Sequence, residues 1–157
     1  MIHVSISDAS DLTLEDVVFD VNGTLAYRGN LMPGVAERIA ALKKLVRVRL
    51  ASADTFDSLD KIAATLELEA IVAPTAAAKL RLLEALGPAS SAHVGNGTND
   101  AAALERAALG IAVLGPEGVS RRAIAAADIF YISVINAIDA LLDPRILAAS
   151  LKGGDAE

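Results

Sequence analysis

The chain contains no cysteine, so neither a disulfide framework nor a thiolate metal site can form. Its two histidines, His3 and His93, lie far apart in the sequence, and neither has a second ligand at metal-binding spacing. Aromatic residues make up only 3% of the chain, which leaves few rings on which bases or sugars could stack. The formal net charge is −6 and no basic cluster offsets it, so we expect no nucleic-acid partner.

Long apolar runs and targeting signals are lacking as well. No stretch approaches the roughly 18 uncharged apolar residues that are typical of a membrane-spanning helix. The N-terminus does not show the basic and then apolar pattern of a signal peptide. We therefore expect no membrane insertion and a cytoplasmic location.

Small apolar residues are plentiful. Hydrophobic residues make up 54% of the 157 residues, and with so few aromatics the core must be built from Ala, Leu, Ile and Val. This length suits one domain with a single core. We expect that domain to span residues 1–151, and residues 152–157 to form a disordered tail.

Short apolar runs alternate with helical patterns almost throughout the sequence. They predict an α/β fold, a three-layer, doubly wound parallel sheet of the Rossmann-like type. Residues 1–8 alternate between apolar and polar and predict an edge strand, and residues 26–32 predict a small hairpin. Further strands are expected near residues 17–20, 46–50, 70–73, 91–94, 110–114 and 128–133, and helices near residues 34–45, 56–66, 75–86, 101–108 and 119–127 and from 135 and 144.

One of these strands delivers an acid to the edge of the sheet. Residues 17–19 are apolar on both faces, as in a central parallel strand, and Asp20 follows where such sheets bind ligands. Gly23 then permits a tight turn and Thr24 adds a hydroxyl. The same residues are also ordinary turn chemistry between two strands, so this stretch alone leaves both interpretations open.

Two further strands end in polar loops, at residues 52–55 and 96–100. Because the carboxyl ends of parallel strands lie along one edge, these loops can converge with Asp20, and Lys79 can reach the same edge from a helix. Together they offer a nucleophile, a hydroxyl, a fixed cation and a metal-binding acid. That set suits phosphoryl transfer, in which positioning and charge neutralisation do most of the work.

Each member also has a purely structural explanation. Ser52 could cap the next helix, and Asp54 or Thr55 could do so equally well. Lys79 could be an ordinary solvated lysine, and residues 96–100 could be a glycine-rich turn with a helix cap. The functional interpretation is favoured because all of these features occur in the right order at the right ends of the elements.

These residues resemble the four motifs of the haloacid dehalogenase superfamily. The similar runs are Phe19-Asp20-Val21-Asn22-Gly23-Thr24-Leu25, then Ser52-Ala53-Asp54, then Lys79, and then Gly95-Asn96-Gly97-Thr98-Asn99-Asp100. The resemblance covers about residues 14–151. It is closest to the small soluble proteins related to the phosphorylation domain of P-type ATPases. Ala103-Leu104 and Gly110-Ile111-Ala112 resemble an Ala-Leu helix and a Gly-Ile-Ala strand that follow the fourth motif in those transporters.

The resemblance implies a magnesium-assisted mechanism that passes through an aspartyl phosphate. Asp20 would attack phosphorus, and the other catalytic positions would be Asn22, Ser52 and Lys79. The phosphate would be bound by Gly23, Thr24, Ser52, Ala53 and Lys79. Magnesium would be held by Asp20, the backbone carbonyl of Asn22, Asn96 and Asp100.

Two positions depart from the usual phosphatase pattern. Asn22 stands where the acid/base aspartate is usual, and an amide cannot perform proton transfer that is typically worth about 10² to 10⁴ in rate. Asn96 stands where a metal-binding carboxylate is usual, so one negative charge is lost and magnesium should bind more weakly. We therefore expect a slow phosphatase or phosphotransferase. P-type ATPases also lack an acid at the first of these positions, and their phosphoenzyme persists.

Two other functions stay open. The chain could be a catalytically silent fold that binds a phosphorylated ligand, or an interaction module that works beside a membrane transporter. The intervals from Asp20 to Ser52 and from Ser52 to Lys79 each leave room for one crossover unit, so we expect no cap domain. An open site suits a phosphorylated small molecule or a bulkier phosphate, and the apolar composition favours a homo-oligomer.

Overall fold

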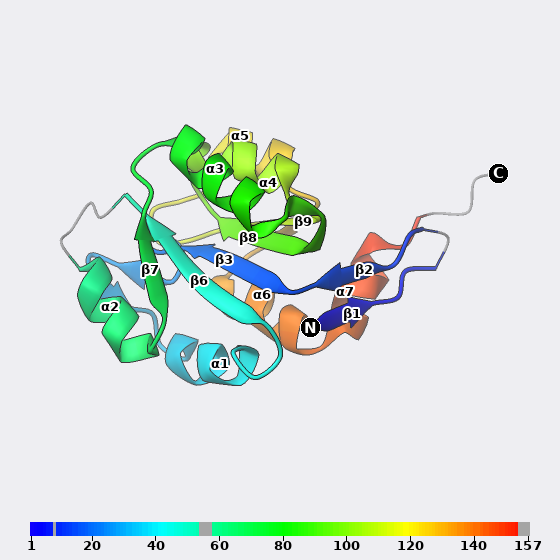
Figure 1. Ribbon diagram of the computed structural model, residues 1–157, viewed down its shortest axis with the longest axis horizontal. Coiled ribbons are helices and arrows are strands. Elements are labelled where there is room, and N and C mark those ends of the chain that lie inside the picture. Colours follow the sequence, from blue (N-terminus) through cyan, green and yellow to red (C-terminus); the bar gives the residue numbers. More distant parts are fainter. Residues whose placement is uncertain (8, 54–57, 154–157) are drawn as a thin grey trace.

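The structure is a computed structural model that describes residues 1–7, 9–53 and 58–153. Asp54, Thr55 and Phe56, where we predicted a helix cap and the start of a helix, lie outside the described residues, as does most of the predicted tail. Six parallel strands form the central sheet, in the order β10-β9-β8-β3-β6-β7 (Figure 1). Their bounds are β3 Asp16–Asp20, β6 Arg47–Ser52, β7 Glu69–Val72, β8 Ser91–Gly95, β9 Leu109–Val113 and β10 Ile129–Tyr131.

Helices cover both faces of this sheet, which confirms the predicted three-layer α/β fold. Helices α3, α4 and α5 pack side by side on one face, above the sheet in Figure 1. On the other face α1 packs against α6, with α2 beside α1 and α7 beside α6. The bounds are α1 Val35–Leu42, α2 Leu59–Leu66, α3 Ala76–Leu86, α4 Ala101–Arg106, α5 Arg121–Ala126, α6 Val134–Leu142 and α7 Pro144–Leu151. None of the helices in the described ranges is long and apolar enough to cross a membrane.

Strand β3 lies in the middle of the sheet, and all five of its residues are buried. Its β-branched and aromatic side chains suit a strand that is covered on both faces. At the amino end, Asp16 accepts two hydrogen bonds from the guanidinium of Arg47, at 3.0 and 2.7 Å. At the carboxyl end the strand stops at Asp20, so the central-strand prediction is confirmed and this acid lies at the sheet edge.

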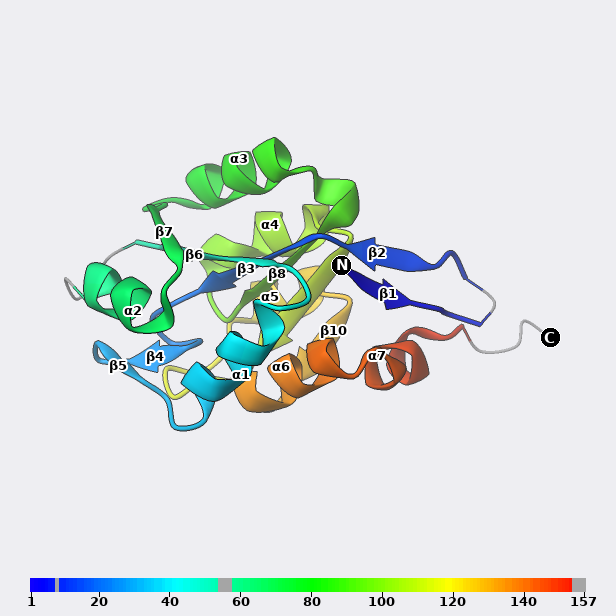
Figure 2. The same cartoon turned by 60° about the horizontal axis from the view of Figure 1, so that its bottom comes forward.

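The prediction for the first strand was wrong in extent and in partner. Instead of an edge strand over residues 1–8, the chain forms β1 (Ile2–Val4), which pairs antiparallel with β2 (Leu12–Leu14) in a separate two-stranded sheet (Figure 2). Ile2 and Val4 are buried, as their alternation indicated, and the strand that carries them pairs with β2 and packs against α7. Alternation of apolar and polar residues predicts that one face of a strand is buried, but it does not identify the elements that pack on that face.

The small hairpin predicted beside the site is confirmed. Strands β4 (Ala26–Tyr27) and β5 (Asn30–Leu31) pair antiparallel, and both turn residues between them have positive φ angles, as tight hairpins require.

Two helices end earlier than predicted. Helix α1 stops at Leu42 rather than Leu45, and α4 stops before Ala108, because that residue's N–H already bonds to the carbonyls of Pro88, just before β8, and Ser91, at its start.

Candidate active site

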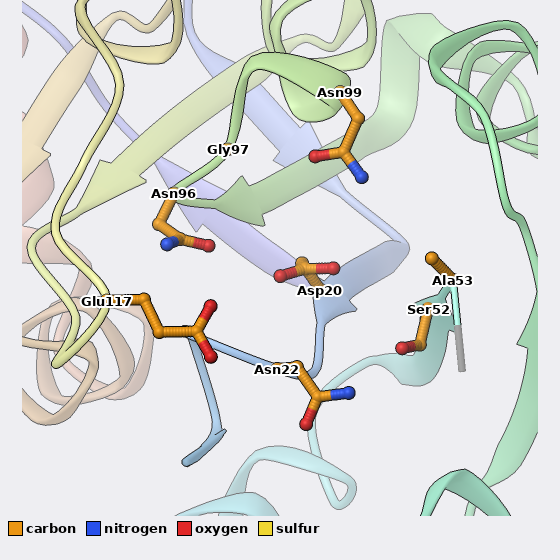
Figure 3. Close-up of a pocket in the computed structure, with 8 residues that line it drawn as sticks. All are labelled: Asp20, Asn22, Ser52, Ala53, Asn96, Gly97, Asn99 and Glu117. Carbon is orange, nitrogen blue, oxygen red and sulfur yellow. The ribbon is translucent and has the colours of Figure 1, made fainter. Parts of the chain in front are cut away.

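The carboxyl ends of β3, β6 and β8 meet at one edge of the sheet. Strand β3 pairs with both neighbours, so that Asp20 lies opposite Ala51 and Phe19 lies opposite Val94. The polar loops that follow these strands surround a cavity of about 240 Å³ (Figure 3). Its walls are formed by Asp20, Asn22, Ser52, Ala53, Asn96, Gly97, Asn99 and Glu117.

Lys79 lies behind Asp20, between two carboxylates. Its Nζ is 2.6 Å from Oδ1 of Asp20 and 2.7 Å from Oδ1 of Asp100, and none of the three side chains is more than 9% exposed. Thr75 fixes the start of the helix that carries this lysine, because its hydroxyl accepts a hydrogen bond from the N–H of Ala78. A buried ammonium without partners would be costly, so Lys79 is here a partner of two acids and not a solvated lysine.

Asp100 is held from several sides. Nε2 of His93 lies 2.9 Å from its Oδ1, and the N–H of Gly97 donates to its Oδ2 at 3.0 Å. Its side chain is fully buried and is not part of the cavity wall. In this structure Asp100 therefore positions Lys79 and the loop after β8. The expectation that it also binds a cation stays a prediction.

The two acids that share Lys79 have opposite pKa shifts. Burial, and then the neighbouring Asp100 carboxylate, raise the pKa of Asp20 to about 6, although Lys79 opposes this. Burial also disfavours charge on Asp100, but its interactions with His93 and Lys79 outweigh burial and lower its pKa to about 2. Burial lowers the pKa of Lys79, yet the two carboxylates leave it above its usual value. An additional cation in the cavity would therefore stabilise the ionised form of Asp20 more than that of Asp100.

The turn after β3 links Asp20 to the loop after β8. Gly23 has a φ of 82°, which L side chains rarely adopt, and an added Cβ would lie 2.7 Å from Nδ2 of Asn96. Thr24 is fully buried, and its hydroxyl lies 3.2 Å from both Oδ2 of Asp20 and Oδ1 of Asn96. Because a hydroxyl has one proton, Thr24 donates to one of these oxygens at a time. The glycine and the threonine therefore each have a specific task in this turn.

The two asparagines that depart from the phosphatase pattern flank the cavity. Oδ1 of Asn22 is buried, and no described residue donates a hydrogen bond to it. Nδ2 of Asn96 donates to the backbone oxygen of Gly118 at 3.0 Å, while its Oδ1 faces Thr24. A carboxylate in place of Asn96 would lack this donor.

The oxygen atoms around the cavity fit a hard divalent cation. Asp20 offers a carboxylate and Asn96 an amide oxygen at the cavity wall, while the side chain of Asn22 is directed away from Asp20 (Figure 3). Within the described ranges, no three His, Cys, Asp or Glu side chains lie close enough together to hold a metal. A cation here would therefore be bound by few carboxylates, assisted by amide and carbonyl oxygens and by water.

The structure brings together all of the residues predicted for the site. Asp20, Asn22, Ser52, Ala53 and Asn96 line the cavity, and Gly23, Thr24, Lys79 and Asp100 lie next to it. Their chemical roles stay predictions. Sequence reasoning named Gly97 and Asn99, which also line the cavity, only as members of the fourth motif, and it gave no role to His93 and Glu117. Two signals could have found them, since His93 is a polar residue within a buried strand and Glu117 lies in the loop after β9, a parallel strand of the same sheet.

A model of the protein family described as hydrolase, haloacid dehalogenase-like hydrolase, matches residues 3–108. That match includes all four motifs identified in the sequence. An uncharacterized protein of Methanocaldococcus jannaschii is 38% identical over 77 residues, which are 46% of this chain and 83% of that protein.

Solved phosphatase structures share the fold at low sequence identity. The magnesium, phosphate and KDO complex of 3-deoxy-D-manno-octulosonate 8-phosphate phosphatase from Moraxella catarrhalis has a TM-score of 0.66 and 18% identity, over 87% of this chain and 90% of that one. The cobalt-bound deoxy-D-mannose-octulosonate 8-phosphate phosphatase from Haemophilus influenzae has a TM-score of 0.62 and 16% identity, over 90% and 94%. A phospho-aspartyl intermediate analogue of phosphoserine phosphatase has a TM-score of 0.64 and 17% identity, over 75% and 93%.

Proposed function

The chain belongs to the haloacid dehalogenase-like hydrolases, and on this premise we propose that it is a magnesium-dependent phosphatase or phosphotransferase whose nucleophile is Asp20. The observation that carries the proposal is the ammonium of Lys79, which joins the carboxylates of Asp20 and Asp100 directly behind a polar cavity. A fixed cation beside a nucleophile offsets the charge of an incoming phosphate, which is the main task of a protein in phosphoryl transfer.

The reaction proceeds in two displacements at phosphorus. In the first, an oxygen of Asp20 attacks phosphorus and the bond to the leaving oxygen breaks, so that Asp20 carries the phosphoryl group. In the second, water attacks phosphorus, the bond to Asp20 breaks and inorganic phosphate leaves; an alcohol in place of water makes the reaction a phosphotransfer. Ser52, at the cavity wall, hydrogen-bonds a phosphoryl oxygen, and Lys79 neutralises charge.

Asn22 makes this reaction slow. Its amide can neither protonate the leaving oxygen in the first displacement nor accept a proton from water in the second. Solvent must therefore supply and remove these protons. The phosphorylated form of Asp20 should persist longer than it would with an acid at position 22.

Magnesium is the cation we propose for the cavity, because the available ligands are the oxygens of Asp20, the Asn22 carbonyl and Asn96. When bound, it supplies positive charge that stabilises the phosphoryl oxygens. The solved relatives support a divalent ion, since one of them contains magnesium and another cobalt. Burial raises the pKa of Asp20 to about 6, and a bound cation would lower it and favour the ionised nucleophile.

The proposed substrate is a phosphorylated small molecule or a bulkier phosphate. Between Asp20 and Lys79 the described residues form only the β4–β5 hairpin, two helices and two strands, so no cap domain covers the cavity there. The solved relatives are named as phosphatases of an octulosonate 8-phosphate and of phosphoserine, which supports a small ester. A homo-oligomer and a cytoplasmic location stay predictions.

A second candidate function rests on the two asparagines. With amides at both Asn22 and Asn96, the same fold can bind a phosphorylated ligand without turning it over. This silent module differs from the slow enzyme in one measurable respect, since it binds a phosphate mimic but forms no covalent phosphoryl adduct.

Radiolabelled acetyl phosphate with magnesium tests the proposal. We expect an acid-stable, hydroxylamine-sensitive label on the protein, together with slow release of phosphate. Asp20→Asn should lose both, because an amide oxygen is a poor nucleophile toward phosphorus. Wild-type turnover in that variant would make Asp20 a turn residue and contradict the proposal. Protection against heat by beryllium fluoride with magnesium, but no label and no turnover, would identify the silent module.

A further inference from the structure

Glu117 brings a carboxylate to the cavity wall near the two asparagines (Figure 3). It lies in the turn that follows β9, outside the four sequence motifs, and its side chain is exposed at the mouth of the cavity. Its Oε2 lies against the turn after β3, since a Cβ added to Gly23 would be 2.8 Å from that oxygen. Two separate loops therefore meet at this carboxylate.

Asn96 holds the turn that carries Glu117. Its Nδ2 donates to the backbone oxygen of Gly118 at 3.0 Å, and its own backbone oxygen accepts the N–H of Ser120 at 2.8 Å. The residue that lacks the usual carboxylate is thus the residue that anchors Glu117. A carboxylate at position 96 would lose the first of these bonds, because it has no proton to donate.

The turn is also fixed against the turn that follows Asp20. Its ends are closed by a hydrogen bond of 2.9 Å from the N–H of Gly118 to the oxygen of Gly115. A Cβ added to Gly115 would lie 1.7 Å from the backbone oxygen of Gly23, so only glycine permits this approach. The backbone of Glu117 therefore has a defined position relative to Asp20, even though its side chain reaches solvent.

We propose that Glu117 supplies the magnesium site with the negative charge that Asn96 does not. The inference rests on the proposed function, in which a cation occupies the cavity. Because the described acids do not gather into a direct ligand set, Glu117 acts through the hydration shell of the cation. Magnesium usually keeps several of its waters, and carboxylates that orient them tune its affinity. Glu117 does not touch the reacting phosphate and is a positioning residue.

Magnesium binding to the intact chain tests this inference without any measurement of turnover. By isothermal titration calorimetry with magnesium chloride, Glu117→Gln should raise the Kd for magnesium by about 10- to 100-fold, as for other residues that act beyond the direct ligands. The matched control is Glu84→Gln, which removes an exposed carboxylate from α3 outside the cavity wall. The control should keep the wild-type Kd. Both variants should keep the wild-type melting temperature without metal.

A second variant tests the link between Glu117 and Asn96. In an Asn96→Asp background, the site has regained a carboxylate and Glu117 has lost the bond that anchors its turn. Glu117→Gln should therefore weaken magnesium binding by much less than in the wild type. Equal effects in the two backgrounds would mean that the two residues act independently. They would overturn the proposal that Glu117 supplies the negative charge that Asn96 lacks.

The outcomes separate this inference from the proposed function. If Glu117→Gln binds magnesium as tightly as Glu84→Gln does, Glu117 is a solvated turn residue and the inference is wrong, even where Asp20 is labelled. If the wild type binds no magnesium, the inference fails together with the proposed cofactor. If magnesium binding depends on Glu117 but Asp20 is never labelled, the inference holds and the enzyme proposal fails.

Discussion

The ammonium nitrogen of Lys79 lies 2.6 Å from a carboxylate oxygen of Asp20, in a part of the protein where neither side chain is more than 9% exposed. The same nitrogen contacts Asp100, so one cation compensates two buried anions. Such an arrangement is costly to break, because removing one partner leaves buried charge without compensation. The same cation also lies where charge must be neutralised during phosphoryl transfer.

Lys79→Met should therefore destabilise the protein as well as abolish labelling of Asp20. We expect the free energy of unfolding at pH 7 to fall by about 3–5 kcal/mol, measured by chemical denaturation. Lys44→Met is the matched control, since it removes an exposed lysine, and it should change the stability by less than about 0.5 kcal/mol. Similar effects of the two substitutions would show that Lys79 is not a compensating charge.

The raised pKa of Asp20 predicts that this residue lowers the free energy of unfolding by an amount that depends on pH. Between its ordinary value of 3.8 and about 6, the folded protein binds a proton at Asp20 that the unfolded chain has released. Stability from this group therefore falls as the pH rises through that window. A pKa of about 6 against 3.8 corresponds to about 3 kcal/mol for a group this deeply buried.

Asp20→Asn removes that cost. In the presence of EDTA, the stability of the variant relative to wild type should increase by about 2 kcal/mol between pH 4.5 and pH 7.5, since the remainder of the effect falls below pH 4.5. Denaturation series at several pH values measure this difference, above the range in which Asp100, with its pKa of about 2, titrates. Magnesium should reduce the difference, because a cation favours ionised Asp20. A difference that does not change with pH would contradict the assignment.

Much of the site could be predicted because its residues follow directly from local patterns. A short apolar run that ends in Asp20, and polar loops after two other strands, suffice once the sheet is recognised as parallel. Lys79 follows from its place in the chain between those loops. These features need no knowledge of which distant side chains touch each other.

The rest depends on contacts between distant segments, which sequence patterns do not specify. Which sheet the first strand joins is decided by the partners available to it, here β2 and α7, and so the first strand was wrongly placed. The part that His93 plays in the site depends on its contact with Asp100, in the loop that follows β8, and the sequence does not specify that contact. Glu117 comes to the site because the side chain of Asn96, in the loop after β8, donates a hydrogen bond to the backbone oxygen of Gly118 in the turn after β9.

The close contact between Gly115 and Gly23 predicts an unusually sensitive glycine. Gly115→Ala should cost about 1–3 kcal/mol of unfolding free energy, because the added methyl meets a backbone oxygen that cannot move aside. Gly153→Ala is the control, since nothing lies within 4 Å of its added Cβ, and it should be neutral. A neutral Gly115→Ala would mean that the turn after β9 is not fixed against the turn after β3.

The last prediction concerns the residue that makes the proposed enzyme slow. Asn22→Asp restores a group that can protonate the leaving oxygen and then activate water. Turnover with an aryl phosphate should rise by about tenfold to a thousandfold, the lower part of the range for general acid–base catalysis. The gain should be larger for phenyl phosphate than for para-nitrophenyl phosphate, because the poorer leaving group needs the proton more. An equal gain for both substrates would argue against proton transfer by the new acid.

Adding Asn96→Asp should lower the magnesium concentration that this variant requires and raise its turnover further, because it adds one more carboxylate to the cavity wall. The structure also predicts a cost. The new carboxylate would face the backbone oxygen of Gly118, which now accepts a hydrogen bond from Nδ2, and losing that bond should destabilise the protein by about 1–3 kcal/mol. Turnover and stability should therefore change in opposite directions, as denaturation and steady-state kinetics on the same samples would show. If the single and double variants fold but neither hydrolyses faster than the wild type, the site is not a disabled phosphatase, and the silent phospho-ligand-binding module becomes the better description.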